Sequence, residues 1–300
     1  VRVNATGNLS VMVGAHSHGQ GHETVFPQIV GEMLGIDPAS VDIVHGDTSK
    51  IPFGMGTYGS RSLAVCGSAM VRATEKIIAK AKKIAAHMLE ASADDVDFTD
   101  GQFTVKGTDK SVSFGEVALK AYIPHEFPIE DIEPGLEETA FYDPANFTYP
   151  SGAYACEVEV DPETGKVTVE RFTACDDFGN VMNPMIVSGQ VHGGVVQGIG
   201  QALLENTSYD ENGQLLSASY MDYVMPRADD LPFIAVDHED GTPCTHNPLG
   251  AKGCGEGGAI GSPPTVVNAV IDALQSGGKN VAHIDMPLTP ARVWAAMNNA

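Results

Sequence analysis

The chain has 300 residues, 43% of them hydrophobic, and a formal net charge of −22 at pH 7. So large an excess of carboxylates argues against a nucleic-acid partner and an anionic membrane surface, because both need clustered Lys and Arg. No apolar run is long enough to cross a bilayer, so no membrane insertion is expected. The length exceeds what one compact core usually needs and predicts two packed subdomains.

Cysteine usage indicates a reducing compartment. The five cysteines are odd in number and widely scattered, which favours free thiols in a cytoplasmic protein over a disulfide framework. No C-x-x-C pair occurs, so neither a structural zinc site nor an iron–sulfur cluster is expected within this chain. Since the first residue is Val1, we expect a processed chain or a piece of a longer polypeptide.

A first glycine-rich loop follows the first expected strand, residues 9–13. It carries the run Gly19-Gln20-Gly21-His22 and leads into a helical pattern over residues 24–34. A strand, a glycine-rich loop and a helix in this order suit an anion, because free N–H groups and the positive end of the helix dipole face it.

A second glycine-rich loop, residues 53–62, follows the strand expected at 41–44 and precedes a long helical pattern at 64–93. Two hydroxyls and one guanidinium at a helix N-terminus are suitable partners for a phosphate. A plain serine cap beside a surface arginine is the alternative. The candidate residues are Gly59, Ser60, Arg61 and Ser62.

The middle of the chain contains an expected hairpin at 96–105, a short helix at 113–122 and an acidic, proline-spaced connector at 125–150. We place the subdomain boundary in this connector. The predicted fold class is α+β, with two mixed-sheet subdomains at residues 1–135 and 136–300.

The second half begins with strands expected at 153–160 and 167–175, followed by a helix at 183–205. Gln197 and Gln201 are expected on one face of that helix, while its glycines allow close approach of a neighbouring helix or a ligand. Asp176 and Asp177 are expected to be exposed at a strand end. Further strands are expected at 216–223 and 233–236, with a last helix at 290–298.

The remaining motif is a single carboxylate among glycines, in the run Lys252-Gly253-Cys254-Gly255-Glu256. The helix that follows is expected over 266–274, which puts Glu256 on the loop that leads into it. A carboxylate on a tight, water-poor loop has a pKa that can be tuned for proton abstraction. An exposed glutamate on a glycine turn is the alternative.

Three glycine-rich loops at helix starts and one carboxylate indicate a site for a large phosphorylated cofactor with a base beside it. A metal-dependent hydrolase using His16, His18 and His22 with Glu23 is an alternative, although the spacing is not H-E-x-x-H. No G-x-S-x-G elbow supports nucleophilic hydrolysis. A non-catalytic binding or assembly module also stays open, because the loops explain binding without turnover.

Four motifs in order resemble those of the large, molybdenum-binding chain of the xanthine oxidase family, most closely the branch of carbon monoxide dehydrogenase large subunits. The resemblance covers the whole chain as the C-terminal molybdopterin-binding domain. The motifs are Gly19-Gln20-Gly21-His22-Glu23-Thr24, Gly56-Thr57-Tyr58-Gly59-Ser60-Arg61-Ser62, Val196-Gln197-Gly198-Ile199-Gly200 and Lys252-Gly253-Cys254-Gly255-Glu256.

The resemblance implies a role for each motif. Glu256 matches the active-site glutamate that acts as the base beside the metal, and no residue of this chain is expected to ligate the metal. Cys254 stands where some members carry Val or Ala. The residues implied in cofactor binding are Gly19, Gln20, Gly21, His22, Gly59, Ser60, Arg61, Ser62, Gln197, Lys252 and Gly253.

The resemblance also implies a cofactor and partners. The cofactor is molybdopterin cytosine dinucleotide with molybdenum, and FAD and 2Fe-2S clusters are expected on partner chains. The N-terminal molybdenum-binding half, as a separate chain or as the rest of the same polypeptide, would supply the remainder of the pocket. The implied reaction is oxidative hydroxylation of a small substrate such as carbon monoxide, an aldehyde or an N-heterocycle.

Overall fold

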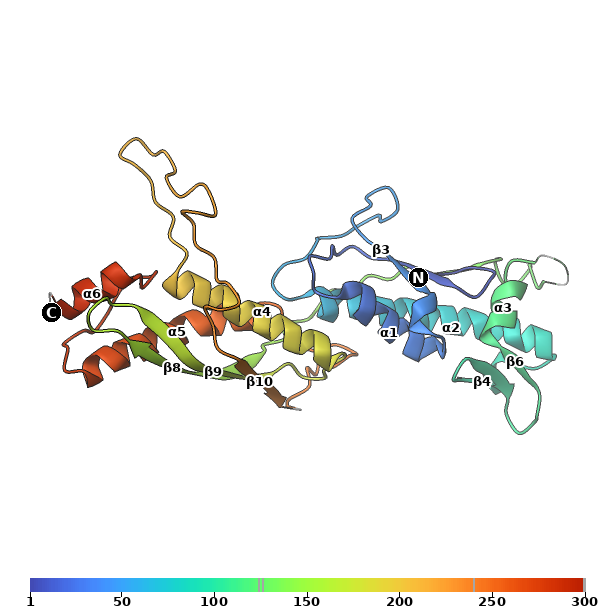
Figure 1. Cartoon of the computed structure of the whole chain (residues 1–300). Coiled ribbons are helices and arrows are strands. Elements are labelled where there is room, and N and C mark those ends of the chain that lie inside the picture. The colour runs from blue at the N-terminus through green and yellow to red at the C-terminus, as the bar shows by residue number, and fades with distance from the viewer. Residues whose placement is uncertain (124, 126, 240, 299–300) are drawn as a thin grey trace. The chain divides into compact units, whose positions relative to one another are not determined.

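The computed structural model describes residues 1–123, 125, 127–239 and 241–298, and its architecture is α+β, as predicted (Figure 1). The chain forms two compact units. Unit 1 comprises Val1–Thr148 with Cys244–Ala251, and unit 2 comprises Tyr149–Pro243 with Lys252–Ala300. The sequence-based boundary lay at 135/136, whereas unit 1 extends to Thr148 and also takes in a short segment from much later in the chain.

Unit 1 contains a four-stranded sheet in the order β3-β2-β1-β7. Strands β2 and β3 are parallel, and the other neighbours are antiparallel. Helix α1 makes the crossover that two parallel neighbours require. The elements are β1 (Arg2–Val3), β2 (Leu9–Met12), α1 (His22–Leu34), a 3₁₀ turn (Pro38–Ser40), β3 (Val41–Val44) and β7 (Leu136–Glu137).

A long helix and a small antiparallel sheet complete unit 1. The helix expected at 64–93 begins with a π-helical turn, Leu63–Gly67, continues as α2 (Ser68–Leu89) and ends at Glu90, which is left-handed. The hairpin predicted around Asp100-Gly101 is confirmed. Its sheet, in the order β4-β5-β6, and the short helix after it comprise β4 (Val96–Thr99), β5 (Gln102–Val105), β6 (Ser111–Ser113) and α3 (Phe114–Lys120), with a 3₁₀ turn at Ala93–Asp95 before β4.

Unit 2 is built on a three-stranded sheet, β10-β9-β8. Strand β8 (Ser151–Val160) pairs antiparallel with β9 (Val167–Asp177), and β10 (Ile234–Glu239) lies parallel to β9. The strand predicted at 216–223 is wrong: this stretch consists of bends, turns and irregular chain, although apolar and polar side chains alternate over much of it. Leu216, Tyr220 and Met221 are exposed, so the apolar pattern reflects a surface and not a paired strand. The segment leaves the end of α4 as an extended excursion (Figure 1).

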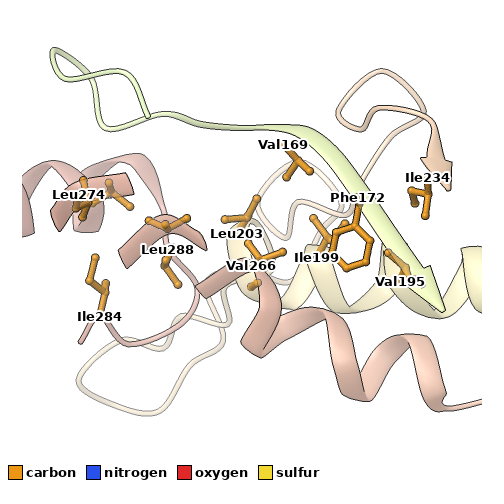
Figure 2. Packing of buried hydrophobic residues seen from close by; sticks show 14 of the residues in the cluster. Val169, Phe172, Val195, Ile199, Leu203, Ile234, Val266, Leu274, Ile284 and Leu288 are labelled. Carbon is orange, nitrogen blue, oxygen red and sulfur yellow. The ribbon is translucent and has the colours of Figure 1, made fainter. Parts of the chain in front are cut away.

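Three helices complete unit 2: α4 (Pro184–Leu203), α5 (Gly257–Ser276) and α6 (Pro290–Asn298). Asn183 caps α4 by accepting from the Ile186 N–H, and Pro184 occupies the first turn, where its missing N–H costs nothing. The core lies between β9 and these helices. Figure 2 shows Phe172 of β9 close to Val195 and Ile199 of α4. Among the described residues, no helix combines the length and hydrophobicity needed to span a bilayer.

Candidate cofactor-binding and catalytic site

The first glycine loop ends at the N-terminus of α1. Gly21 is the N-cap with φ 74° and has no side chain with which to cap the helix, while the Glu23 carboxylate in the first turn bonds to its own N–H. Gly19 has φ 92°, and a Cβ built on it would meet no atom within 4 Å. The backbone therefore faces open space beside the N–H groups of the first helical turn, and such a cradle fits an anionic group.

Two polar side chains of this loop are engaged by the protein itself. His22 is buried, and its ring stacks on Phe26 with centroids 4.8 Å apart. Burial lowers the pKa of His22, so the imidazole is neutral and belongs to the core. The amide oxygen of Gln20 accepts from the His18 N–H. The backbone of the loop, and not the His22 ring, is therefore the part suited to a ligand.

The second glycine loop contains three residues in the left-handed region: Gly56 at φ 75°, Gly59 at 59° and Ser60 at 52°. A Cβ on Gly59 would also meet nothing within 4 Å. Arg61 donates from Nη1 to the Tyr58 hydroxyl over 2.7 Å, and its guanidinium lies 5.2 Å from the centre of that ring. Ser62 is buried and donates to Thr57 Oγ1 over 3.3 Å.

The two loops form one surface. Thr57 Oγ1 accepts from the His16 N–H at 3.1 Å and donates to the His16 carbonyl at 2.5 Å. The Gly56 N–H donates to the Gly14 carbonyl at 3.0 Å. Gly14 and Gly54 cross so closely that a Cβ on Gly14 would lie 2.6 Å from Gly54 Cα. Unit 1 therefore brings its predicted cofactor residues together.

A cavity of about 870 Å³ within unit 1 adjoins the second loop. Of the predicted residues, Arg61 and Ser62 line it. Arg72 and Phe141, which no sequence motif marks, also line it; the Arg72 guanidinium lies 4.6 Å from the centre of the Tyr142 ring. Their only sequence signal is an arginine on a long helix and an aromatic pair in an irregular segment. No spacing links them, because they lie in distant parts of the chain.

The histidines gather on one side of the first loop. The His16 ring lies 4.7 Å from His18 and 5.0 Å from His45, centre to centre. His45 Nε2 lies 2.9 Å from a Glu23 oxygen, and its buried Nδ1 has no hydrogen-bond partner among the residues that the structure describes. His22 is buried and stacked on Phe26, so its ring belongs to the core. In the part of the chain that the structure describes, no three His, Cys, Asp or Glu side chains could hold a metal, which disfavours the hydrolase alternative.

Glu256 lies directly at a helix start in unit 2. The prediction that the helix begins at 266 is wrong, because α5 begins at Gly257 and continues through Pro263 and Pro264. Glu256 is the N-cap, and its carbonyl accepts from the Ile260 N–H at 3.0 Å. Its side chain is exposed in this chain, so the expected water-poor surroundings are not formed by unit 2 alone.

Asp176 and Asp177 are not exposed, contrary to expectation. Asp177 Oδ2 accepts from Lys252 Nζ at 2.7 Å, with the two side chains 16% and 9% exposed. Asp176 is 5% exposed and accepts from the Tyr154 hydroxyl at 3.1 Å. Burial, opposed by that hydrogen bond, raises the pKa of Asp176. Donors from Tyr154, Lys252 and two backbone N–H groups hold the two carboxylates in place.

The rest of the Glu256 loop is largely enclosed. Gly253 is buried, and burial raises the pKa of the Cys254 thiol to about 11. A thiol with such a pKa is protonated and unreactive at neutral pH, so Cys254 behaves as a small hydrophobic residue.

Gln197 is exposed on α4. The buried glycines of this helix pack against α5: a Cβ on Gly194 would lie 3.0 Å from Ala259 N, and one on Gly198 would lie 2.0 Å from Ser262 Oγ. Gly194 and Gly198 thus serve helix packing, and the start of α5 is held beside α4. Unit 2 brings together the helices that carry Gln197 and Glu256.

Comparison with known proteins identifies the family. Residues 1–232 match the family model described as Molybdopterin cofactor-binding domain. The chain belongs to this family, and its resemblance to the molybdenum-binding chains of the xanthine oxidase family is confirmed.

Two curated relatives and two solved structures illustrate the match. The carbon monoxide dehydrogenase large chain of Hydrogenophaga pseudoflava is 45% identical over 298 residues, covering 99% of this chain and 36% of the relative. The nicotine 6-hydroxylase large subunit of Paenarthrobacter nicotinovorans is 39% identical over 297 residues, with the same coverage. The crystal structure of the Cu,Mo-CO dehydrogenase in its carbon monoxide reduced state has a TM-score of 0.91 and 42% identity, covering 99% of this chain and 37% of that one.

Quinoline 2-oxidoreductase from Pseudomonas putida 86 has a TM-score of 0.90 and 37% identity, again covering 99% of this chain and 37% of that one. The chain therefore spans little more than a third of the length of these relatives.

Proposed function

We propose that this chain is the C-terminal half of the catalytic subunit of a molybdenum hydroxylase. The observation that carries the proposal is the pair of joined glycine loops of unit 1, open above Gly19 and Gly59, in a chain that matches the molybdopterin-binding family. The reaction is the oxidative hydroxylation of a small substrate of the carbon monoxide, aldehyde or N-heterocycle class.

The cofactor is molybdopterin, in its cytosine dinucleotide form, with molybdenum. The backbone around Gly19, Gly21 and Gly59, with the hydroxyl of Ser60, holds its phosphates. Gln197 contributes an amide from α4. The helix N-terminus at Gly21 supports this assignment, because a pyrophosphate is the anion that such a backbone cradle binds.

Glu256 is the catalytic base. When bound, the molybdenum centre supplies a Lewis acid and a two-electron acceptor. The carboxylate of Glu256, at the start of α5, accepts a proton during hydroxylation. Adding the oxygen of water to the substrate carbon releases two protons and two electrons, and the electrons leave through other chains.

The partners follow from what this chain lacks and exposes. The N-terminal molybdenum-binding half supplies the rest of the pocket and covers Glu256. FAD and 2Fe-2S clusters on further chains carry the electrons away, and the assembly works in the cytoplasm. Exposed apolar side chains support a large interface; they include Phe53, Phe141, Phe147, Met185, Tyr220, Met221 and Phe233.

The test is Glu256→Gln in the assembled enzyme. The amide keeps the shape but not the basicity, so molybdenum and nucleotide content should stay normal while kcat falls by about 10²- to 10⁴-fold. Glu163→Gln, on an exposed turn, is the matched control. Near-normal turnover of the Glu256 variant would remove the catalytic assignment.

Two other outcomes would redirect the proposal. Stoichiometric zinc with no need for molybdenum would favour the hydrolase that uses His16 and His18. Cofactor binding without reduction by any aldehyde, N-heterocycle or carbon monoxide would favour a non-catalytic binding module.

A further inference from the structure

Lys252 lies four residues before Glu256. Both its side chain and its backbone form hydrogen bonds to residues at the end of β9. Its ammonium donates to Asp177 Oδ2 at 2.7 Å, and its backbone N–H donates to the Phe178 carbonyl at 2.8 Å. The Lys252 side chain is 9% exposed. Its charge is therefore already paired inside unit 2, and it is poorly placed to serve as a free cation for a phosphate.

Asp177 is held as firmly as its partner. Its carboxylate also accepts from the Gly179 N–H at 2.9 Å and from the Thr242 N–H at 3.3 Å. Burial alone would raise the pKa of Asp177, but the bond from Lys252 and the backbone donors lower it below its ordinary value. Because two backbone N–H groups also hold the Asp177 carboxylate, the ion pair is confined to one arrangement. An exposed ion pair, in contrast, adopts many side-chain conformations.

The other side of Glu256 rests on the same strand end. A Cβ on Gly257 would lie 3.6 Å from the Phe178 ring and 3.8 Å from the Tyr154 hydroxyl. A Cβ on Gly261 would lie 2.5 Å from the Tyr154 ring, so α5 sits directly on that ring. Tyr154 is in turn fixed by its hydrogen bonds to Asp176.

We infer that the Lys252–Asp177 ion pair is a positioning device that fixes the backbone of Glu256 from its N-terminal side, while Tyr154 and Phe178 fix it from the start of α5. Lys252 is thus a positioning residue and not a contact to the cofactor. This inference rests on the proposed role of Glu256 as the base. It adds Asp177, which the sequence motif does not contain, to the residues on which catalysis depends.

The test compares Lys252→Met and Asp177→Asn in the assembled, cofactor-loaded enzyme. Each should lower kcat by about 10- to 100-fold, because a base displaced by about 1 Å loses that much rate. KM should change by less than about twofold, and molybdenum and nucleotide content should not change. Amide hydrogen exchange at residues 253–258 should become faster in both variants. Lys252→Arg should retain most of the activity.

The matched control is Lys106→Met. Lys106 forms an ion pair with Asp97 at 3.5 Å, but the side chains are 52% and 61% exposed, so neither kcat nor exchange at 253–258 should change. If Lys252→Met fails to assemble, Asp177→Asn carries the test by itself, because it keeps the cation and removes only the charge of its partner.

Two results would overturn the inference. The first is loss of nucleotide or molybdenum from Lys252→Met but not from Asp177→Asn, which would make Lys252 a cofactor contact. The second is unchanged kcat and exchange in both variants. If Glu256→Gln is active while both ion-pair variants exchange faster, the proposed function fails and the anchoring of the loop stands.

Discussion

Thr57 and His16 are 41 residues apart, yet one hydroxyl satisfies both backbone groups of His16. The same oxygen accepts from the His16 N–H and donates to the His16 carbonyl. This reciprocal pair, and not the glycines alone, holds the two cofactor loops in register. It explains how two segments with little regular structure can present one surface.

The first prediction concerns this link. Thr57→Val keeps the shape but removes the partner of both backbone groups of His16, and because these bonds are exposed the cost is about 0.5–1.5 kcal/mol for each. Molybdenum and nucleotide content of the purified enzyme should fall, as measured by metal analysis and nucleotide release. Thr57→Ser keeps the hydroxyl and should load normally. Equal loading of the Val and Ser variants would show that the loops hold their arrangement without this residue.

A second prediction separates backbone strain from space for the cofactor. Gly59 and Gly107 have φ 59° and 73°, and a Cβ on either would meet nothing within 4 Å. Alanine costs about 1 kcal/mol of strain at both positions. Only Gly59→Ala should reduce cofactor content, because only that Cβ enters the space above the loop. Equal loss of cofactor in both variants would indicate a general effect on stability.

A third prediction concerns the contact between α4 and α5. In Gly198→Ala the new Cβ would lie 2.0 Å from Ser262 Oγ and 2.8 Å from Pro263 Cδ, so the helices must separate. Overpacking of this kind costs about 1–3 kcal/mol, and the thermal midpoint should fall. Gly193→Ala lies on the exposed face of the same helix with nothing within 4 Å, and it should be neutral or slightly stabilising. Calorimetry measures the thermal unfolding midpoints of the two variants. Equal midpoints for Gly198→Ala and Gly193→Ala would contradict the packing role of Gly198.

The fourth prediction uses the raised pKa of Asp176. Because the folded protein holds this proton more tightly, the contribution of Asp176 to stability is present below its ordinary pKa of 3.8 and is lost as the pH rises through the folded value. Asp176→Asn cannot ionise and keeps an acceptor for Tyr154. Its urea midpoint relative to the parent should therefore rise as the pH increases above about 4.

Asp161 provides a control of opposite sign. The hydrogen bond from the Thr164 hydroxyl lowers its pKa, so its contribution is present above 3.8 and is lost as the pH falls. Asp161→Asn should be destabilised near neutral pH, and this difference should vanish in acid. Parallel pH profiles for the two variants would contradict the inward orientation of Asp176.

Much of the fold could be predicted because local sequence patterns, such as apolar periodicity and helix caps, mark its strands and helices. The strand Val41–Val44 and the helix Pro290–Asn298 have the predicted bounds, since apolar periodicity and a proline in the first turn mark them. Residues 216–223 carry the same apolar signal without a partner strand, and periodicity cannot distinguish a strand from an exposed apolar surface. The apolar run 266–274 marks only the later part of α5, because the helix begins at Gly257 among glycines and continues through Pro263 and Pro264, residues that disfavour helix in isolation.

The candidate site was predictable only where one motif holds the residues together. Glycine loops and Glu256 stand out because their composition is unusual over a few positions. The partners of Asp177, Tyr154 and Thr57 could not be predicted, because each side chain bonds to a residue between 22 and 75 positions away. His22 shows the opposite case: a motif marks it, but its ring stacks on Phe26, and its role in cofactor binding stays a prediction.

The path of the chain between the units has a consequence for biosynthesis. Unit 1 includes the late segment Cys244–Ala251. In this segment Leu249 packs against Gly67, and the His246 carbonyl accepts a hydrogen bond from the Tyr142 hydroxyl. A ribosome that has released residues 1–148 has therefore not yet delivered all of unit 1. Its last piece arrives about a hundred residues later, immediately before Lys252, so unit 1 is completed only when the segment bearing the proposed base begins to emerge.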